Sequence, residues 1–181
     1  MPSYFRHIVH FLLVAMMLMS ITSCARWREG KEVVVEADGL LAKGVIMKDT
    51  AALAEVIRTL EPYGRLFARE YLVKAYYLLG RNMDDYYHDF STAADYYIEA
   101  DRLNTKDPIL RGRINSCMGF LCKQDSCFKE ALEFYERANI AFAKTDNQKR
   151  YANGLLSIAE QYVNLKEYNK ADSILQIANN Y

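Results

Sequence analysis

The sequence predicts an all-α protein, an α-solenoid of about three helical hairpins with an N-terminal helical cap. No segment shows the apolar–polar alternation of a half-buried strand, whereas apolar residues recur at helical spacing along most of the chain. A short pattern of aromatic and small residues also recurs three times, at intervals of roughly 40 residues, which indicates stacked repeats.

Residues 1–23 have the composition of a secretory signal peptide. Arg6 gives the chain a weakly basic start, and an apolar stretch follows from Ile8 to Met19. A transmembrane helix needs about 20 consecutive apolar residues, and this stretch is shorter. A basic start, a short apolar core and small residues at the end therefore predict a cleaved export signal. The alternative is an uncleaved anchor.

The signal ends in the run Ile21-Thr22-Ser23-Cys24, which resembles the lipobox of bacterial lipoproteins. That motif has an aliphatic residue, two small residues and a cysteine that carries lipid after cleavage. The resemblance implies a mature chain that begins at Cys24 and is held on a membrane by fatty acyl chains. Two or three chains anchor stably because each buried methylene contributes about 0.8 kcal/mol. A plain signal peptide with a coincidental cysteine is the alternative.

The composition argues against two classes of function. The chain has 23 basic and 23 acidic residues, and removal of residues 1–23 takes away only Arg6, so no basic excess favours nucleic acid. His88 is the only histidine after residue 23, and no phosphate-binding loop, nucleophile motif or metal-binding spacing is present. We therefore predict no enzymatic activity, no cofactor and no metal site.

Three cysteines follow Cys24, and an odd number does not make a closed disulfide framework. Cys117 and Cys122 lie on one predicted helix and point to different faces, so they should not bridge. We expect all three, Cys127 included, to behave as small apolar residues. A Cys122–Cys127 disulfide across a predicted turn is the alternative.

A polar tether over residues 24–31 and a helical cap over residues 32–61 precede the repeats. Apolar residues at helical spacing predict one helix in the first half of the cap. Asp49 is a candidate N-cap for a second helix that ends near Leu60, and Pro62 breaks the pattern.

The repeat domain spans residues 62–181 and reads as six helices. Small polar residues that cap free N–H groups precede most of them, and Pro108 suits the first position of the third helix. The expected starts are Gly64, Asp89, Asp107, Ser126, Asp146 and Glu167.

One pattern, Phe90-x-x-Ala93-x-x-x-Tyr97-x-x-Ala100, recurs three times in this domain. Each copy follows a helix with a small residue in its middle, where two backbones can approach closely. The second copy has Phe128, Ala131, Tyr135 and Ala138, the third has Tyr168, Ala171, Leu175 and Ala178, and the small residues are Gly80, Gly119 and Ala159.

This pattern resembles the tetratricopeptide repeat, a hairpin of two helices, over about residues 73–181. Three departures are present: a one-residue insertion before Phe90, a polar Asn115 at a bulky position, and a proline displaced to Pro108 or absent. The remaining motif positions are Tyr76, Leu79 and Met83 in the first unit, Met118 and Cys122 in the second, and Leu155, Ile158 and Tyr162 in the third.

The resemblance implies a concave groove lined by the first helix of each unit. Only Arg81 and Arg113 supply the charge of a carboxylate clamp there, and Glu160 opposes it, so we expect an extended or helical peptide held by stacking and hydrogen bonds. Ordinary solvated helix surface is the alternative. The groove positions are Lys74, Tyr77, Leu78, Arg81, Arg113, Ser116, Cys117, Phe120, Asn153, Leu156, Ser157 and Glu160.

The lipobox and the tyrosine-rich repeats together resemble envelope lipoproteins of Gram-negative bacteria such as the Bacteroidetes. We expect a lipid-anchored scaffold that binds an envelope protein or peptide, and Ala25 after the lipidated cysteine favours the outer membrane, facing the periplasm. The alternatives are a glycan-capture accessory lipoprotein and a self-assembling structural lipoprotein. For the latter, we expect Ile174, Leu175 or Ile177 to be partly exposed on the last helix and to form a homo-oligomer or dock a partner.

Overall fold

The computed structural model describes residues 33–45, 47–63 and 68–181, and no strand is present within these ranges. The all-α prediction is confirmed there. The signal, Cys24 and the tether lie outside the described residues. The helices are residues 33–45, α2 (Thr50–Leu60), α4 (Arg69–Asn82), α5 (Phe90–Arg102), α6 (Pro108–Gln124), α7 (Phe128–Phe142), α8 (Gln148–Asn164) and α9 (Tyr168–Ala178), with a 3₁₀ turn η1 (Glu61–Tyr63) and a π-helical turn η2 (Met83–Tyr87).

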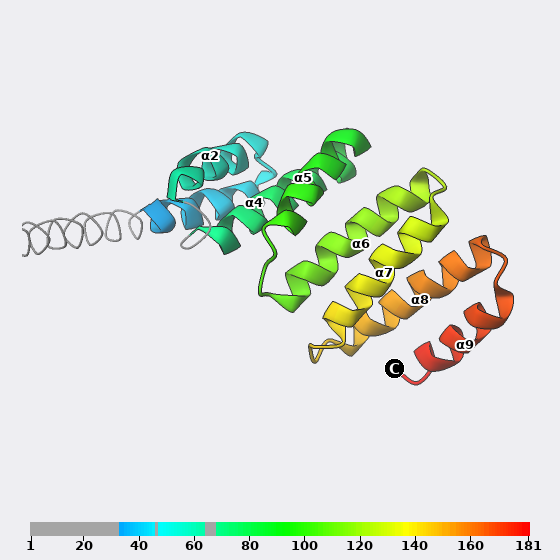
Figure 1. Ribbon diagram of the computed structural model, residues 1–181. Helices are drawn as coiled ribbons and strands as arrows, with labels where there is room; N and C mark the ends of the chain where they lie inside the picture. The colour runs from blue at the N-terminus through cyan, green and yellow to red at the C-terminus, as the bar shows by residue number, and fades with distance from the viewer. Residues whose placement is uncertain (1–32, 46, 64–67) are drawn as a thin grey trace, which may run out of the picture.

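Consecutive helices lie side by side and alternate in direction, so the chain forms a row of antiparallel hairpins (Figure 1). α4 packs on α5, α6 on α7 and α8 on α9. Contacts of α2 with α4, α5 with α6 and α7 with α8 join one hairpin to the next. Each helix therefore packs mainly on its neighbours in the sequence, and the molecule is elongated.

Three predicted N-caps are confirmed. Asp49, Asp89 and Asp107 each accept a hydrogen bond from a backbone N–H two or three residues further on, at donor–acceptor distances of 2.8 to 3.2 Å. Pro108 follows Asp107 as the first residue of α6. Each aspartate satisfies N–H groups that have no partner within their own helix.

Two predicted caps are wrong by one residue. Ser126 has a φ of 60°, in the left-handed region, and Cys127 is the N-cap of α7 without a side-chain hydrogen bond. Asn147, not Asp146, caps α8 and accepts from the N–H of Arg150 at 3.1 Å. Aspartate and asparagine favour the N-cap equally, so the sequence pattern does not choose between such neighbours.

The hairpin turns share one geometry. In each, a residue in the left-handed region comes directly before the N-cap of the second helix, and such a residue reverses the chain after a helix. The same turn joins residues 33–45 to α2, so the segment predicted as a cap is itself a hairpin. The residues and their φ values are Lys48 (55°), His88 (51°), Ser126 (60°) and Lys166 (62°).

Neighbouring helices approach each other most closely at glycine residues. A Cβ atom added at Gly80 would lie 2.5 Å from the ring of Tyr97, and one at Gly119 would lie 3.0 Å from the ring of Tyr135. The predicted close approach of two helices at small mid-helix residues is therefore confirmed at Gly80 and Gly119, and in both cases a tyrosine ring of the same hairpin occupies the contact. Each tyrosine packs directly on the backbone of the preceding helix.

At one contact in the N-terminal hairpin, the larger residue lies on the second helix and the smaller one on the first, the reverse of the order in the α6–α7 hairpin. Gly44 faces the side chain of Leu53, which fills the space that a Cβ atom at Gly44 would need. In the hairpin of α6 and α7, the corresponding positions hold Cys122 and Ala131, in one apolar cluster. A large residue and a small one fill the interface in either order, because the total volume is what the packing requires.

The inserted residue of the α4–α5 hairpin is absorbed by η2. A π-helical turn holds one more residue than an α-helical turn, so the chain reaches the same left-handed turn at His88. η2 also buries Asp84, which is 9% exposed. Two adjacent aspartates such as Asp84 and Asp85 predict a solvated loop, and the burial of Asp84 departs from that expectation.

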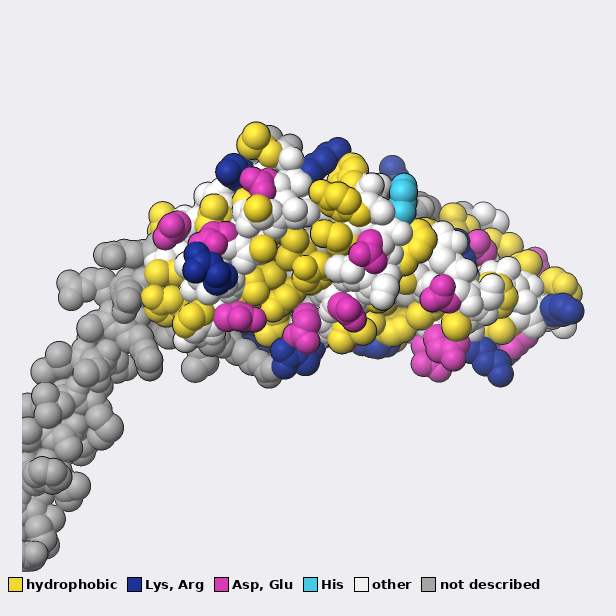
Figure 2. Space-filling view, turned by 90° about the horizontal axis from the view of Figure 1, so that it is seen from above, with side chains coloured by type: hydrophobic (Ala, Val, Ile, Leu, Met, Phe, Trp, Pro, Cys, Tyr) yellow, Lys and Arg dark blue, Asp and Glu magenta, His cyan; other side chains and the backbone are white. Residues whose placement is uncertain are grey.

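The apolar core is larger in the N-terminal half of the chain. One cluster extends from Ala37 to Leu121, whereas the cluster between α7 and α8 has Ala131, Tyr135 and Ile158 at its centre. Figure 2 shows hydrophobic side chains gathered over the N-terminal half of one face. The candidate site lies along α4 and α6, whose buried apolar residues belong to the larger cluster.

The last helix leaves apolar side chains in solvent, as the sequence predicts. Leu175 is 40% and Ile177 is 43% exposed. Ile174 is half-buried and packs on the cluster between α7 and α8. The exposed apolar edge of α9 is therefore confirmed for Leu175 and Ile177.

Candidate functional site

Two cavities lie along α4 and α6. Cavity A, of about 400 Å³, is bounded by the helix of residues 33–45, α4 and the first turns of α6. Cavity B, of about 570 Å³, is bounded by the end of α4, η2 and the second half of α6. Both are therefore built on the first helices of successive hairpins, where the sequence predicts a groove.

The predicted groove residues of the first two units all line these cavities. They reach them because positions three or four apart share one face of a helix. Lys74, Tyr77, Leu78 and Arg113 line cavity A, and Arg81, Ser116, Cys117 and Phe120 line cavity B.

The predicted groove residues of the third unit lie elsewhere. Leu156 is 49% exposed, and the Ser157 hydroxyl donates to the carbonyl oxygen of Asn153 at 3.2 Å. Glu160 pairs with the ammonium group of Lys123 at 3.2 Å. None of the four lines cavity A or cavity B, so the structure brings together two of the three predicted sets.

Tyr77 is not the exposed ligand that the sequence predicts. It is 7% exposed, and its ring centroid lies 6.3 Å from that of Tyr97. The helix of residues 33–45 extends over this part of α4, which sequence reasoning about the repeats did not include. Burial raises the pKa of the Tyr77 phenol, so the side chain stays neutral and can donate a hydrogen bond from the wall of cavity A.

Arg81 forms an ion pair with Asp85, one helical turn further on. The Arg81 Nε atom donates to Asp85 Oδ2 at 2.9 Å, and Nη2 donates to the same oxygen. Burial acts to lower the pKa of the guanidinium, but the hydrogen bond to Asp85 and the charges of Tyr77, Cys117 and Asp85 together outweigh it, so the net shift is upward. Asp85 therefore holds the Arg81 guanidinium in place and partly neutralises its charge. Arg81 is then not free to bind a peptide carboxylate, as a carboxylate clamp would require.

A buried polar cluster lies behind cavity B. The Tyr97 hydroxyl donates to Asp84 Oδ2 at 3.4 Å, and Tyr97 is completely buried. Burial raises the pKa of Asp84, and the neighbouring Asp85 raises it further. Burial also raises the pKa values of Tyr97 and of the Cys117 thiol. The cluster therefore favours neutral side chains, and a thiol of this kind is a weak nucleophile.

The two cavities differ in their charge. In cavity A, Lys74 and Arg113 face Asp38 and Asp107, and most of the other lining side chains are apolar. In cavity B, Arg81 faces Asp84 and Asp85, next to Phe120. Neither lining has an excess of positive charge, so a partner segment with apolar anchors suits them better than a free anion does.

The structure also bears on metal binding, disulfide formation and membrane-spanning helices. Within residues 33–45, 47–63 and 68–181, no group of three His, Cys, Asp or Glu side chains could hold a metal ion. Cys117, Cys122 and Cys127 are free, so the alternative Cys122–Cys127 disulfide is not formed. None of the helices in the described part of the chain is long and apolar enough to cross a bilayer.

No protein-family model and no curated protein matches this chain.

Proposed function

We propose that this protein is a lipid-anchored scaffold of the bacterial envelope that binds a segment of another protein. In this proposal the hairpins form a tetratricopeptide-like solenoid, and its groove runs over α4 and α6. The observation that carries it is the meeting of eight sequence-predicted groove residues in two neighbouring cavities. Residues chosen by repeat position alone would not converge in this way on an unrelated bundle of helices.

The hairpin contacts support the solenoid part of the proposal. The same left-handed turn recurs in four hairpins, and glycine meets tyrosine at equivalent places in two of them. Repetition of this kind is typical of α-solenoids, in which each unit contacts only its neighbours. On this interpretation the segment first assigned as a cap is a further unit, and it lengthens the groove towards the N-terminus.

The cavity linings indicate the kind of segment that binds. Apolar side chains of Leu78, Ile109 and Leu110 in cavity A suit an aliphatic or aromatic anchor, and Lys74 and Arg113 lie at its border. Phe120 in cavity B offers a ring for stacking. We infer an amphipathic helix or extended peptide that places two apolar side chains, one in each cavity.

Quantitative crosslinking in native membranes tests the groove. We expect one dominant envelope partner with the wild type and its loss in Lys74→Glu/Arg113→Glu, because both substitutions reverse exposed charges beside cavity A. The matched control, Lys129→Glu/Lys149→Glu, reverses two exposed charges outside both cavities and should keep the partner. Equal recovery of the partner from both double variants would contradict the proposal.

Cys24 carries the membrane part of the proposal, because it ends the lipobox-like run. Metabolic labelling with an alkyne fatty acid should label the wild type and not Cys24→Ala. The variant should also leave the membrane pellet, since it lacks the cysteine that would carry the lipid. Labelling of Cys24→Ala, or its retention in the pellet, would separate the binding function from lipid anchoring.

Glycan capture is a second candidate, favoured by an exposed aromatic group at η2. Tyr86, Tyr87 and Phe90 are 49%, 62% and 40% exposed. Aromatic faces of this kind can stack on sugar rings. Calorimetric titration with cell-wall and plant oligosaccharides distinguishes the two candidates, because a protein-binding scaffold should give no heat of binding.

Self-assembly is a third candidate, favoured by the exposed side chains of α9. Leu175 and Ile177 present an apolar edge that a second copy could cover. Light scattering of the wild type and of Ile177→Glu tests it. A monomer in both cases removes this candidate.

A further inference from the structure

We propose that a third cavity, cavity C, binds a small polyanion through its phosphate or carboxylate groups. Cavity C has a volume of about 540 Å³ and lies between the α5–α6 loop, α6 and α7. It shares no lining residue with cavities A and B, so it is separate from the proposed groove. Its size is in the range of small-molecule sites, roughly 300–1,000 Å³.

The charge of the lining is the first argument. Lys106, Arg111, Arg137 and Lys144 line the cavity, and Asp101 is the only carboxylate in the lining. The whole chain balances 23 basic with 23 acidic residues, so this concentration of one sign is local. Like charges around one cavity repel each other, and an anion between them removes that cost.

Three of the four cations have no carboxylate partner. Arg137 pairs with Asp101 at 2.9 Å, which ties α7 to α5. The Arg111 Nη2 atom donates to Asn104 Oδ1 at 2.7 Å and to the Thr105 carbonyl oxygen, and both acceptors are neutral. Among the described residues, neither Lys106 nor Lys144 forms a salt bridge. Their charge is therefore available to a ligand.

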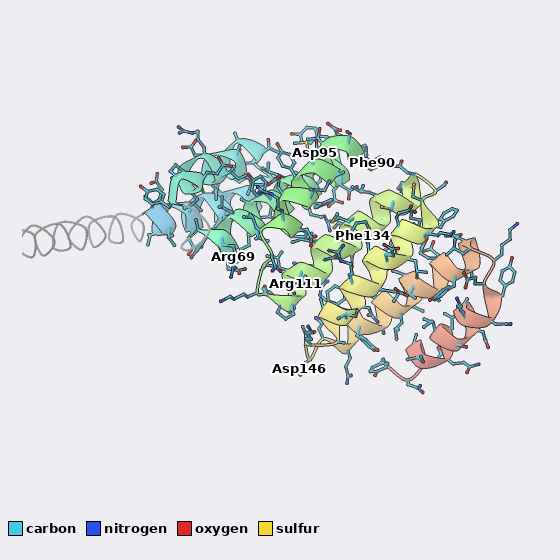
Figure 3. The ribbon with its side chains drawn as sticks, in the orientation of Figure 1. Arg69, Phe90, Asp95, Arg111, Phe134 and Asp146 are labelled. Atoms are coloured by element: carbon cyan, nitrogen blue, oxygen red, sulfur yellow. The ribbon has the colours of Figure 1, made fainter. Side chains whose placement is uncertain are left out.

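The position of Arg111 is fixed before any ligand binds. It is half-buried near the start of α6, beside the end of α7 (Figure 3), and its two hydrogen bonds hold the guanidinium against the α5–α6 loop. The loop is itself held by Glu70, which accepts from the Thr105 hydroxyl and from the Lys106 N–H at 3.0 Å. A planar guanidinium held in this way binds phosphate and carboxylate oxygens with little further loss of entropy.

The side chain of Asn115 supplies the second argument. It lines cavity C, is 1% exposed, and its Nδ2 atom donates to the Arg111 carbonyl oxygen at 2.9 Å. Its Oδ1 atom is buried without a hydrogen-bond donor. An unsatisfied buried acceptor is unfavourable, so this wall of the cavity is polar and suits a polar ligand better than an apolar one.

The N-terminus of α6 does not provide the site. Asp107 already accepts the N–H groups of Ile109 and Leu110, at 2.8 and 3.2 Å. Its carboxylate would oppose an anion at that point. The binding groups are therefore the side chains of the α5–α6 loop, α6, α7 and the turn after α7.

Titration calorimetry of the purified full chain, with pyrophosphate and with citrate at fixed ionic strength, tests the proposal. We expect saturable binding of one anion per chain. The Kd should rise about tenfold or more in Lys106→Gln/Lys144→Gln, which removes two unpaired cations. The matched control, Lys129→Gln/Lys149→Gln, removes two exposed cations outside cavity C and should leave the Kd within about twofold.

Two results would overturn the site: no saturable binding of either anion, or equal weakening in the control variant. Tighter binding of pyrophosphate than of citrate assigns a phosphorylated ligand, and the reverse order assigns a carboxylated one. The thermal midpoint without ligand separates binding from folding. Because the lysines repel each other, the midpoint of Lys106→Gln/Lys144→Gln should equal or exceed that of the wild type, and a fall would count against an unpaired cluster.

Discussion

The hairpins α4–α5 and α6–α7 are built alike but differ by one residue. In both, a tyrosine of the second helix packs on a glycine of the first. In the first hairpin the additional residue forms η2, and the hydroxyl of the buried Tyr97 reaches the buried Asp84. In the second, Tyr135 lies in a cluster with Ala131 and Ile158. The inserted residue thus gives the α4–α5 hairpin a buried polar contact between Tyr97 and Asp84, where the α6–α7 hairpin has an apolar one. This polar contact lies next to cavity B.

The largest difference between the hairpins is expected for Gly80→Ala and Gly119→Ala. The new Cβ atom would overlap the ring of Tyr97, which cannot move because it is completely buried, so we expect a loss of about 2–3 kcal/mol. At Gly119 the contact of 3.0 Å is less severe, and the helix propensity gain of about 1 kcal/mol offsets it. Urea denaturation measures both. Equal losses would show that the two interfaces are packed alike.

Removal of each tyrosine hydroxyl gives the next largest difference. Tyr97→Phe leaves Asp84 without its buried donor and should cost about 1–2 kcal/mol. Tyr135→Phe removes a hydroxyl outside any such pair and should cost less than about 0.5 kcal/mol. Urea denaturation of the two single variants gives the comparison. A larger cost for Tyr135→Phe would contradict the importance of the polar pair.

The pH dependence of the unfolding free energy tests the contribution of Asp84. Its pKa is raised above the ordinary value of 3.8, so the folded state favours the protonated acid. The stability that this proton contributes is present at low pH and is lost as the pH rises through the raised pKa. Asp84→Asn should therefore flatten the fall in unfolding free energy above about pH 4. Asp95→Asn, at an exposed position of α5, should keep the wild-type slope, and a slope unchanged in Asp84→Asn would contradict the account.

The smallest effect is expected where α6 meets α8. Lys123→Gln removes the ion pair with Glu160, which is 52% exposed in its side chain. Surface pairs of this kind contribute less than about 1 kcal/mol and are screened by salt. We expect a change below about 0.5 kcal/mol that disappears at high salt. A larger change that persists in salt would mean that this contact helps to hold the hairpins together.

Sequence reasoning succeeded where local chemistry decides the structure. Asp49, Asp89 and Asp107 cap helices because a short acidic side chain can reach the free N–H groups of the first turn. The small residue in the middle of the first helix of a hairpin predicted a close helix approach, which the structure has at Gly80 and Gly119. Both signals lie within one or two adjacent elements, and a single sequence contains them in full.

Sequence reasoning failed where residues distant in the chain decide the structure. The N-terminal hairpin was missed because its large and small residues are exchanged at Gly44 and Leu53. Tyr77 is buried, and residues from the helix of 33–45 and from α6 line cavity A beside it. Cavity C was missed because its cations come from two loops and two helices, and no motif links Lys106 with Lys144.

The central claim is that the groove over α4 and α6 is the binding surface, and photo-crosslinking in living cells tests it most directly. The photoreactive residue is placed at Ser116, which lines cavity B, or at Glu133, an exposed position of α7 outside all three cavities. The account predicts an adduct with one envelope protein from Ser116, abolished by Lys74→Glu/Arg113→Glu, and no such adduct from Glu133. The same adduct from Glu133, or one from Ser116 that the groove variant does not change, would contradict it.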